Sequence, residues 1–189
     1  MSNDVSRRKT LRRVVRVMML MAFAWLAWVV SGYMSQSVVP EGHSGMDIDL
    51  TGLAPGDYMI VRSGQRKMIV WHRTDEMLAR LMGAQEHLQD PDSSKSQQPS
   101  AAADPYRSID PQYLVVLARN EIQDCDVQAL AEDHPQVPVT PWYGGFRDSC
   151  QDIYFDLAGR SYKHREEQRN LDVPPHQIIA GKLYIMEED

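Results

Sequence analysis

The side chains of this chain best suited to redox or metal chemistry are two cysteines and six histidines. The cysteines, Cys125 and Cys150, are too far apart to form the Cys-x-x-Cys motif of thiol–disulfide oxidoreductases. No histidine stands at ligand spacing from a second histidine or a cysteine, and we expect scattered surface residues: His43, His72, His87, His134, His164 and His176. Neither residue type therefore forms a recognisable catalytic or metal-binding motif.

Carboxylates flank the two cysteines and suggest a hard cation such as calcium. They are Asp124, Asp126, Asp148 and Asp152. Because solvated aspartates are common in loops, this pattern defines no site by itself, and we predict no metal ligand. Glycine-rich phosphate loops, nucleophile elbows and zinc-protease motifs are absent from the sequence. We therefore expect a protein that is not itself catalytic.

The order of segments around the cysteines resembles the Rieske iron–sulfur family. Residues 120–125 follow an apolar strand at 114–118, where the family has a Cys-Thr-His-x-Gly-Cys box. Residues 144–152 stand where the family has Cys-Pro-Cys-His-Gly-Ser, before a Phe-Asp-x-x-Gly-Arg turn at 155–160. The later segments also resemble the family, at residues 170–175 (Asn-Leu-Asp-Val-Pro-Pro) and 182–185.

The resemblance implies that every cluster ligand has been replaced. A Rieske centre needs two thiolates on one iron and two imidazoles on the other. The thiolate positions hold Asn120 and Asp148, and the imidazole positions hold Ile122 and Gln151. Isoleucine has no donor atom, and amides and carboxylates are poor substitutes for thiolate or imidazole. We therefore predict no 2Fe–2S cluster. The remaining cysteine of each box is disulfide-bonded in the family, which implies a bond between the two cysteines of this chain.

The same resemblance implies an all-β fold. We expect a Rieske-like antiparallel β-sandwich over residues 46–189, with one short helix and a degenerate cluster-binding subdomain at 113–175. Local patterns agree, because 58–62 and 67–72 favour a hairpin and Thr74 is a suitable N-cap for a helix from Asp75 to about His87. The polar stretch 89–110 has little apolar area, so we expect an exposed, flexible loop there.

The N-terminal part has the features of a membrane anchor. Residues 1–16 are basic and contain a motif that resembles a twin-arginine export signal, and residues 17–34 form an uncharged, largely apolar stretch. Residues 35–45 contain proline and glycine and read as a neck. Because the basic cluster precedes the predicted transmembrane helix, we expect a single-pass protein of a bacterial inner membrane with its domain in the periplasm. The net charge of −6 does not indicate a basic nucleic-acid-binding surface, and we expect no nucleic-acid partner.

Fold and anchor together imply a non-redox accessory subunit of a respiratory membrane complex. Its expected partners are cytochrome b of a quinol–cytochrome c oxidoreductase, or a terminal oxidase in a supercomplex. One alternative is a true Rieske electron-transfer subunit that takes both thiolates from the cysteines and its imidazoles from His134 and His164. Another is an assembly factor that occupies the docking site transiently.

Overall fold

The computed structural model describes residues 15–16, 18–26, 47–120, 125–135, 137–163 and 168–186. The chain divides into two compact units, Met1–Glu41 and Gly42–Asp189. In the first unit, residues 18–26 are helical. Within the described ranges, none of the helices combines the length and the apolar character that crossing a membrane requires. The twin-arginine-like motif, the neck at 35–45 and part of the predicted span 17–34 lie outside these ranges.

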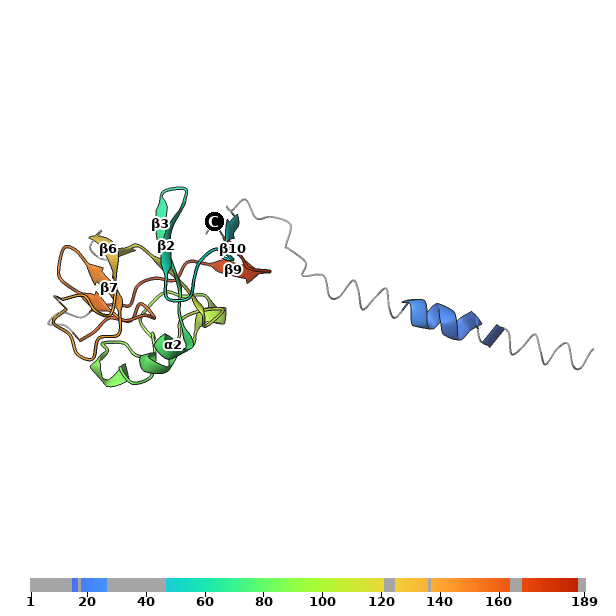
Figure 1. The fold of residues 1–189 in the computed structure, drawn as a ribbon, viewed down its shortest axis with the longest axis horizontal. Coiled ribbons are helices and arrows are strands. Elements are labelled where there is room, and N and C mark those ends of the chain that lie inside the picture. Colours follow the sequence, from blue (N-terminus) through green and yellow to red (C-terminus); the bar gives the residue numbers. More distant parts are fainter. Residues whose placement is uncertain are drawn as a thin grey trace, which may run out of the picture. The chain divides into compact units, whose positions relative to one another are not determined.

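The second unit is built from antiparallel sheets (Figure 1). One has the order β1 (Asp47–Asp49), β10 (Lys182–Ile185) and β9 (His176–Ile179). The next has the order β2 (Tyr58–Ser63), β3 (Arg66–His72) and β4 (Tyr113–Leu117). The last has the order β5 (Arg119–Asn120), β6 (Cys125–Leu130), β7 (Gly145–Asp148) and β8 (Tyr154–Phe155). The prediction of a mostly antiparallel β fold is therefore confirmed.

The sheet β2-β3-β4 lies in the middle of this unit and is covered on both faces. Successive side chains of a strand point to opposite faces, so Met68 and Val70 enter one apolar cluster while Ile69 and Trp71 enter another. The first cluster includes Leu183 of β10, and the second includes residues of β7 and β8. Figure 1 shows the same order, with β9 and β10 on one side of the β2–β3 hairpin and β6 and β7 on the other.

The predicted hairpin and helix are both present, but the helix is shorter than expected. Strands β2 and β3 pair from Tyr58 opposite Trp71 to Ser63 opposite Arg66. Helix α2 (Asp75–Leu81) begins after Thr74, whose Oγ1 accepts a hydrogen bond from a backbone N–H at 3.2 Å, as a helix N-cap does. It ends before Gly83, a residue that disfavours helix, and a separate 3₁₀ turn η1 (Gln85–His87) follows.

The segment 89–110, expected to be an exposed and flexible loop, is exposed only in part, and its flexibility stays a prediction. Several residues of the segment are at most 1% exposed, namely Ala102, Arg107 and Ser108. The carboxylate of Asp90 accepts hydrogen bonds from the backbone N–H groups of Ser94 and Lys95, each at 3.0 Å. The side-chain amide of Asn170 donates to the Asp90 carbonyl at 2.9 Å. A second 3₁₀ turn, η2 (Ser100–Ala102), lies in the same segment. This segment has little apolar area to bury, and hydrogen bonds therefore hold it against the rest of the domain.

Candidate functional site at the disulfide loops

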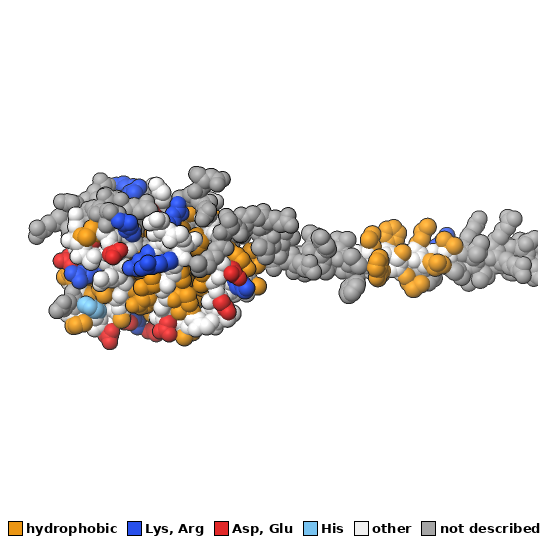
Figure 2. Space-filling view, turned by 90° about the horizontal axis from the view of Figure 1, so that it is seen from above, with side chains coloured by type: hydrophobic (Ala, Val, Ile, Leu, Met, Phe, Trp, Pro, Cys, Tyr) orange, Lys and Arg blue, Asp and Glu red, His pale blue; other side chains and the backbone are white. Residues whose placement is uncertain are grey.

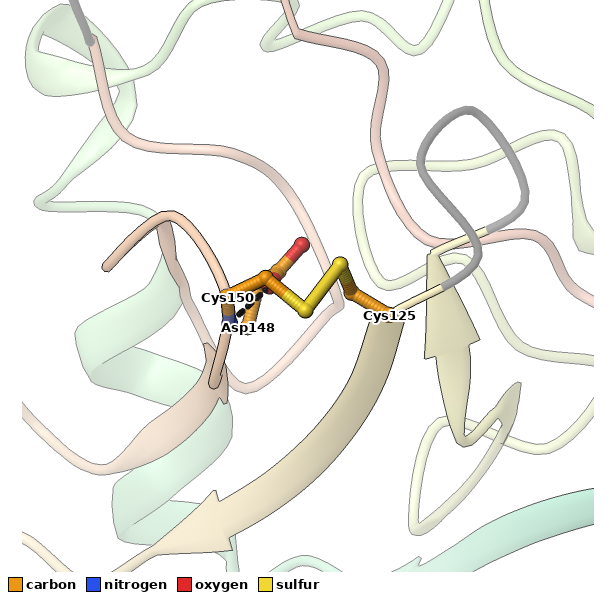
Figure 3. Close-up of side chains that lie close together, drawn as sticks. All are labelled: Cys125, Asp148 and Cys150. Atoms are coloured by element: carbon orange, nitrogen blue, oxygen red, sulfur yellow. Dashed lines mark hydrogen bonds between the residues drawn. A yellow bond between two sulfur atoms is a disulfide. The ribbon is translucent and has the colours of Figure 1, made fainter.

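The two cysteines are joined at the end of the β5–β8 sheet. Cys125 is the first residue of β6 and Cys150 follows β7, which places their Cα atoms 5.9 Å apart with a bond between the sulfur atoms. Figure 3 shows this bond linking the start of β6 to the loop after β7, with Asp148 beside Cys150. Neither cysteine is a free thiol. The disulfide implied by the resemblance is therefore present.

The two residues at the predicted thiolate positions contact each other directly. The side-chain amide of Asn120 donates a hydrogen bond of 2.9 Å to Oδ2 of Asp148. Both residues are buried, with 7% and 0% of their surface exposed. The other carboxylate oxygen, Oδ1, accepts hydrogen bonds from the backbone N–H of Cys150 at 2.8 Å and from that of Gln151 at 3.4 Å. A polar contact thus joins β5 to the end of β7, beside the disulfide.

The two predicted imidazole positions are placed less closely. Gln151 is exposed, and its recorded hydrogen bond within the described part of the chain is made by its backbone N–H. Ile122 lies outside the described residues, as does His164, one of the histidines considered as an alternative ligand. His134 lies in the segment after β6. Whether these positions correspond to the cluster ligands of the family remains a prediction.

The four aspartates near the cysteines do not form a common cation site in the described part of the chain. Both oxygens of Asp148 already accept N–H groups, and Asp152 is paired with Arg147. Asp126 is exposed, and Asp124 lies outside the described residues. Among the described residues, the group with clustered potential ligand atoms is Cys125, Asp148 and Cys150, whose atoms lie within 4.8 Å of one another. Its two sulfur atoms are bonded together, so it offers no thiolate.

Behind these loops lies a set of buried arginines that the sequence reasoning did not identify as a group. Arg160 pairs with Asp156 at 2.7 Å, within the Phe-Asp-x-x-Gly-Arg turn. Arg73 donates to the carbonyl of Leu157 at 2.9 Å, and Arg107 donates to that of Ala158 at 3.2 Å. Burial lowers the pKa of Arg73 and of Arg107 to about 10, so both remain charged at neutral pH. The turn is therefore held by an ion pair of its own and by two arginines from other segments of the chain.

The expectation that all histidines are surface residues is wrong for His176. This residue begins β9 and is 1% exposed. Its Nδ1 lies 2.8 Å from the carbonyl oxygen of Pro174, so Nδ1 carries the proton of the neutral ring. Nε2 has no hydrogen-bond partner among the described residues. Because His176 stands directly after two prolines in a short strand, the sequence pattern did not indicate that its side chain is buried.

The fold and the paired loops define an antiparallel β domain with a disulfide between two of its loops. No family model matches the chain. The ubiquinol-cytochrome c reductase iron-sulfur subunit of Allochromatium vinosum is 33% identical over 144 residues, which cover 76% of this chain and 70% of that protein. A solved chain described as "Hyperthermophilic respiratory Complex III" has a TM-score of 0.44 at 12% identity, covering 90% of this chain and 96% of that chain. The chain belongs to the family of Rieske iron–sulfur subunits of ubiquinol–cytochrome c reductase, as a degenerate member.

The residues of this member do not fit the cluster that gives the family its name. A Rieske centre requires two thiolates and two neutral imidazoles. Both sulfur atoms of this chain are in one disulfide, and Asn120 and Asp148 use their polar atoms on each other and on the backbone. Amide and carboxylate groups that are already bonded in this way do not supply the soft ligands that iron–sulfur chemistry needs.

Proposed function

We propose that this protein is a non-redox, cluster-free accessory subunit of a respiratory membrane complex. The complex is a quinol–cytochrome c oxidoreductase or its supercomplex with a terminal oxidase. The observation that carries the proposal is the hydrogen bond between Asn120 and Asp148, beside a closed disulfide. It joins the two loops through protein atoms, so the loops need no iron to hold them together. Family membership supports the type of complex, because the Allochromatium vinosum relative is named as a reductase subunit.

The location follows from the sequence. Residues 17–34 anchor the chain in a bacterial inner membrane, and the N-terminus remains in the cytoplasm with the basic residues that precede the anchor. The domain then lies in the periplasm, an oxidising compartment that suits the disulfide. In this role the domain presents a binding surface to cytochrome b or to the oxidase, and it carries no electron and performs no catalysis.

The first test measures iron and acid-labile sulfide in the full chain extracted from membranes, together with low-temperature paramagnetic resonance after mild reduction. The Allochromatium vinosum relative, prepared in the same way, is the positive control. We expect neither iron nor a Rieske-type signal in this protein. A stoichiometric cluster would overturn the proposal and establish the electron-transfer alternative.

A second test separates a permanent subunit from an assembly factor. The full chain, tagged at its C-terminus, is purified in mild detergent, and cytochrome b and the terminal oxidase are quantified in the product. A permanent subunit is expected at constant stoichiometry with the mature complex, whereas an assembly factor is found with immature complexes and is absent from the mature one. Pulse labelling distinguishes the two cases, because an assembly factor dissociates as labelled cytochrome b matures.

A further inference from the structure

The basic residues of the domain are distributed unevenly. The chain has 20 lysines and arginines and 26 aspartates and glutamates, and six basic and two acidic residues precede residue 47. The remaining 14 basic and 24 acidic residues give residues 47–189 a net charge of −10. Against this background, the described residues that line one hollow of about 440 Å³ include four basic side chains and one acidic side chain: Arg62, Arg66, Lys67, Arg119 and Asp126. Arg66 and Arg119 already have interaction partners, and the described lining of this hollow is basic on an acidic domain.

This hollow lies at the turn of the β2–β3 hairpin, where β4 passes into β5. Figure 2 looks down on the hairpin end and shows lysine and arginine side chains gathered on that face beside apolar ones. A second hollow, of about 370 Å³, shares Arg66 and Leu117 with the first and continues toward Gln97 and Pro174. Each hollow has the size of a typical ligand pocket, and the two hollows, which adjoin at Arg66 and Leu117, are together called the groove.

The pairing of the hairpin is a second, independent observation. The strand register places Arg62 directly opposite Lys67, on the same face of the sheet. Like charges at directly opposed positions of an antiparallel pair destabilise the sheet. Arg62 is exposed, and Lys67 is only partly buried. The hairpin thus holds two cations together at a cost to its own stability, and an anion bound between them offsets that cost.

From these observations we propose that the groove binds an acidic segment of a protein partner, whose carboxylates lie between Arg62 and Lys67. This inference rests on the proposed function, since it names the chemistry of the contact through which the domain joins a complex. Arginine recognises carboxylates with paired hydrogen bonds, and clustered cations favour a run of acidic residues over a single one.

The test uses the full chain in detergent and a fluorescent hexaglutamate peptide as the probe. The variant R62Q/K67Q removes two positive charges from the groove, and the control K163Q/K182Q removes two exposed positive charges elsewhere. We expect binding that weakens with salt and a loss of affinity of about tenfold in the groove variant, with the control close to the wild type. The melting temperature of R62Q/K67Q should equal or exceed that of the wild type, because the like-charge pair is gone.

Equal losses of affinity in both variants, or no binding of the peptide, would overturn the proposal. Inorganic phosphate and vesicles of phosphatidylglycerol serve as competing probes. Vesicle binding that depends on Arg62 and Lys67, without peptide binding, would assign the groove to lipid and also overturn it. Aggregation of R62Q/K67Q with unchanged peptide affinity would mean that the charges only protect the edge strand β2, which is a third contradicting result.

The proposal and the proposed function can fail separately. Co-purification of cytochrome b is measured for the wild type and both variants at increasing salt. We expect R62Q/K67Q to lose the complex at lower salt than K163Q/K182Q. If the variants retain the complex equally, the groove proposal fails and the subunit role stands. If the wild type never co-purifies while peptide binding still depends on the groove, the subunit role fails and the acidic-segment site stands.

Discussion

At the residue level, two different bonds join the loops that we predict to correspond to the cluster-binding loops of the family. The Cys125–Cys150 disulfide is covalent, while the contact between Asn120 and Asp148 is a buried hydrogen bond to a carboxylate. The two are adjacent, because Asn120 is the strand partner of Cys125 and the backbone N–H of Cys150 donates to Asp148. Each bond therefore restrains the loops in a separate way, and each can be removed on its own.

Removing the disulfide should lower stability mainly by relaxing the unfolded chain. The two cysteines are 25 residues apart in sequence, and a loop of this length corresponds to about 3 kcal/mol in the chain-entropy model. We expect C125S/C150S to lose about that free energy of unfolding in urea titrations. Reduction of the wild type should reproduce the loss. A reduced wild type as stable as the oxidised one would contradict this account.

Removing the side-chain amide of Asn120 should leave the buried Oδ2 of Asp148 without this hydrogen-bond donor. We expect N120A to lose about 1–3 kcal/mol of unfolding free energy, since an unsatisfied buried acceptor costs its desolvation. In a double-mutant cycle, N120A and D148A should be less than additive, because each destroys the same contact. Q151A, at an exposed neighbour, is the control. Additive losses would show that the contact contributes nothing.

His176 should make stability depend on pH. Burial lowers its pKa below the ordinary value of 6.5. As the pH falls below 6.5, the unfolded chain therefore takes up a proton before the folded chain does, and stability falls until the folded pKa is reached. The slope for one such group is at most about 1.4 kcal/mol per pH unit. We expect the free energy of unfolding in urea to fall more steeply below pH 6.5 in the wild type than in H176L. Identical slopes would exclude His176 as the cause.

Only part of the candidate site was predictable at this scale. The resemblance to the family predicted the cysteine pairing, which the structure confirms, and placed Asn120 and Asp148 at two ligand positions, which stays a prediction. It gave no reason to expect a contact between those two residues, because that contact depends on β5 and β7 both lying against β6. Interpreting each position separately as a lost ligand does not reveal that Asn120 and Asp148 can form a hydrogen bond with each other.

At the scale of elements, regular strands were predictable and the segment 89–110 was not. Alternation and β-branched residues identified β2, β3 and β4, since these patterns reflect burial on one or both faces. Composition counts the apolar area of a segment but not its hydrogen bonds. The contacts of Asp90 and Asn170 connect residues about 80 positions apart, and no local pattern announces them. The same limit applies to α2, whose end depends on one turn at Gly83.

Asn170 should be the residue that holds this segment in place. Its side chain donates to the Asp90 carbonyl at 2.9 Å and to Ser93 Oγ at 2.8 Å, and it accepts from the backbone N–H of Ser161 at 2.9 Å. We expect N170A to cost about 3 kcal/mol and to raise hydrogen exchange across 89–110. Q97A, at an exposed residue of the same segment, is the control. Fast exchange of 89–110 already in the wild type would contradict this prediction.

At the scale of the whole domain, the two larger apolar clusters among the described residues lie on either side of one sheet. Three fully buried arginines connect the turn at 155–160 to distant segments through backbone carbonyls. Buried guanidinium groups are costly unless they are paired, and here Asp156 supplies a charge partner for Arg160. All of these contacts are made by protein atoms. Folding should therefore be independent of iron.

This independence can be measured by refolding. We expect the full chain, unfolded in denaturant and diluted into detergent with a glutathione redox buffer and an iron chelator, to recover its circular dichroism and melting temperature. Addition of iron and sulfide should change neither, because the loops are already joined by the disulfide and by Asn120 and Asp148. The Allochromatium vinosum relative is the control, since an iron–sulfur subunit should gain absorbance and stability from the same addition. A rise in the melting temperature of this chain on adding iron and sulfide would mean that its loops bind a cluster after all.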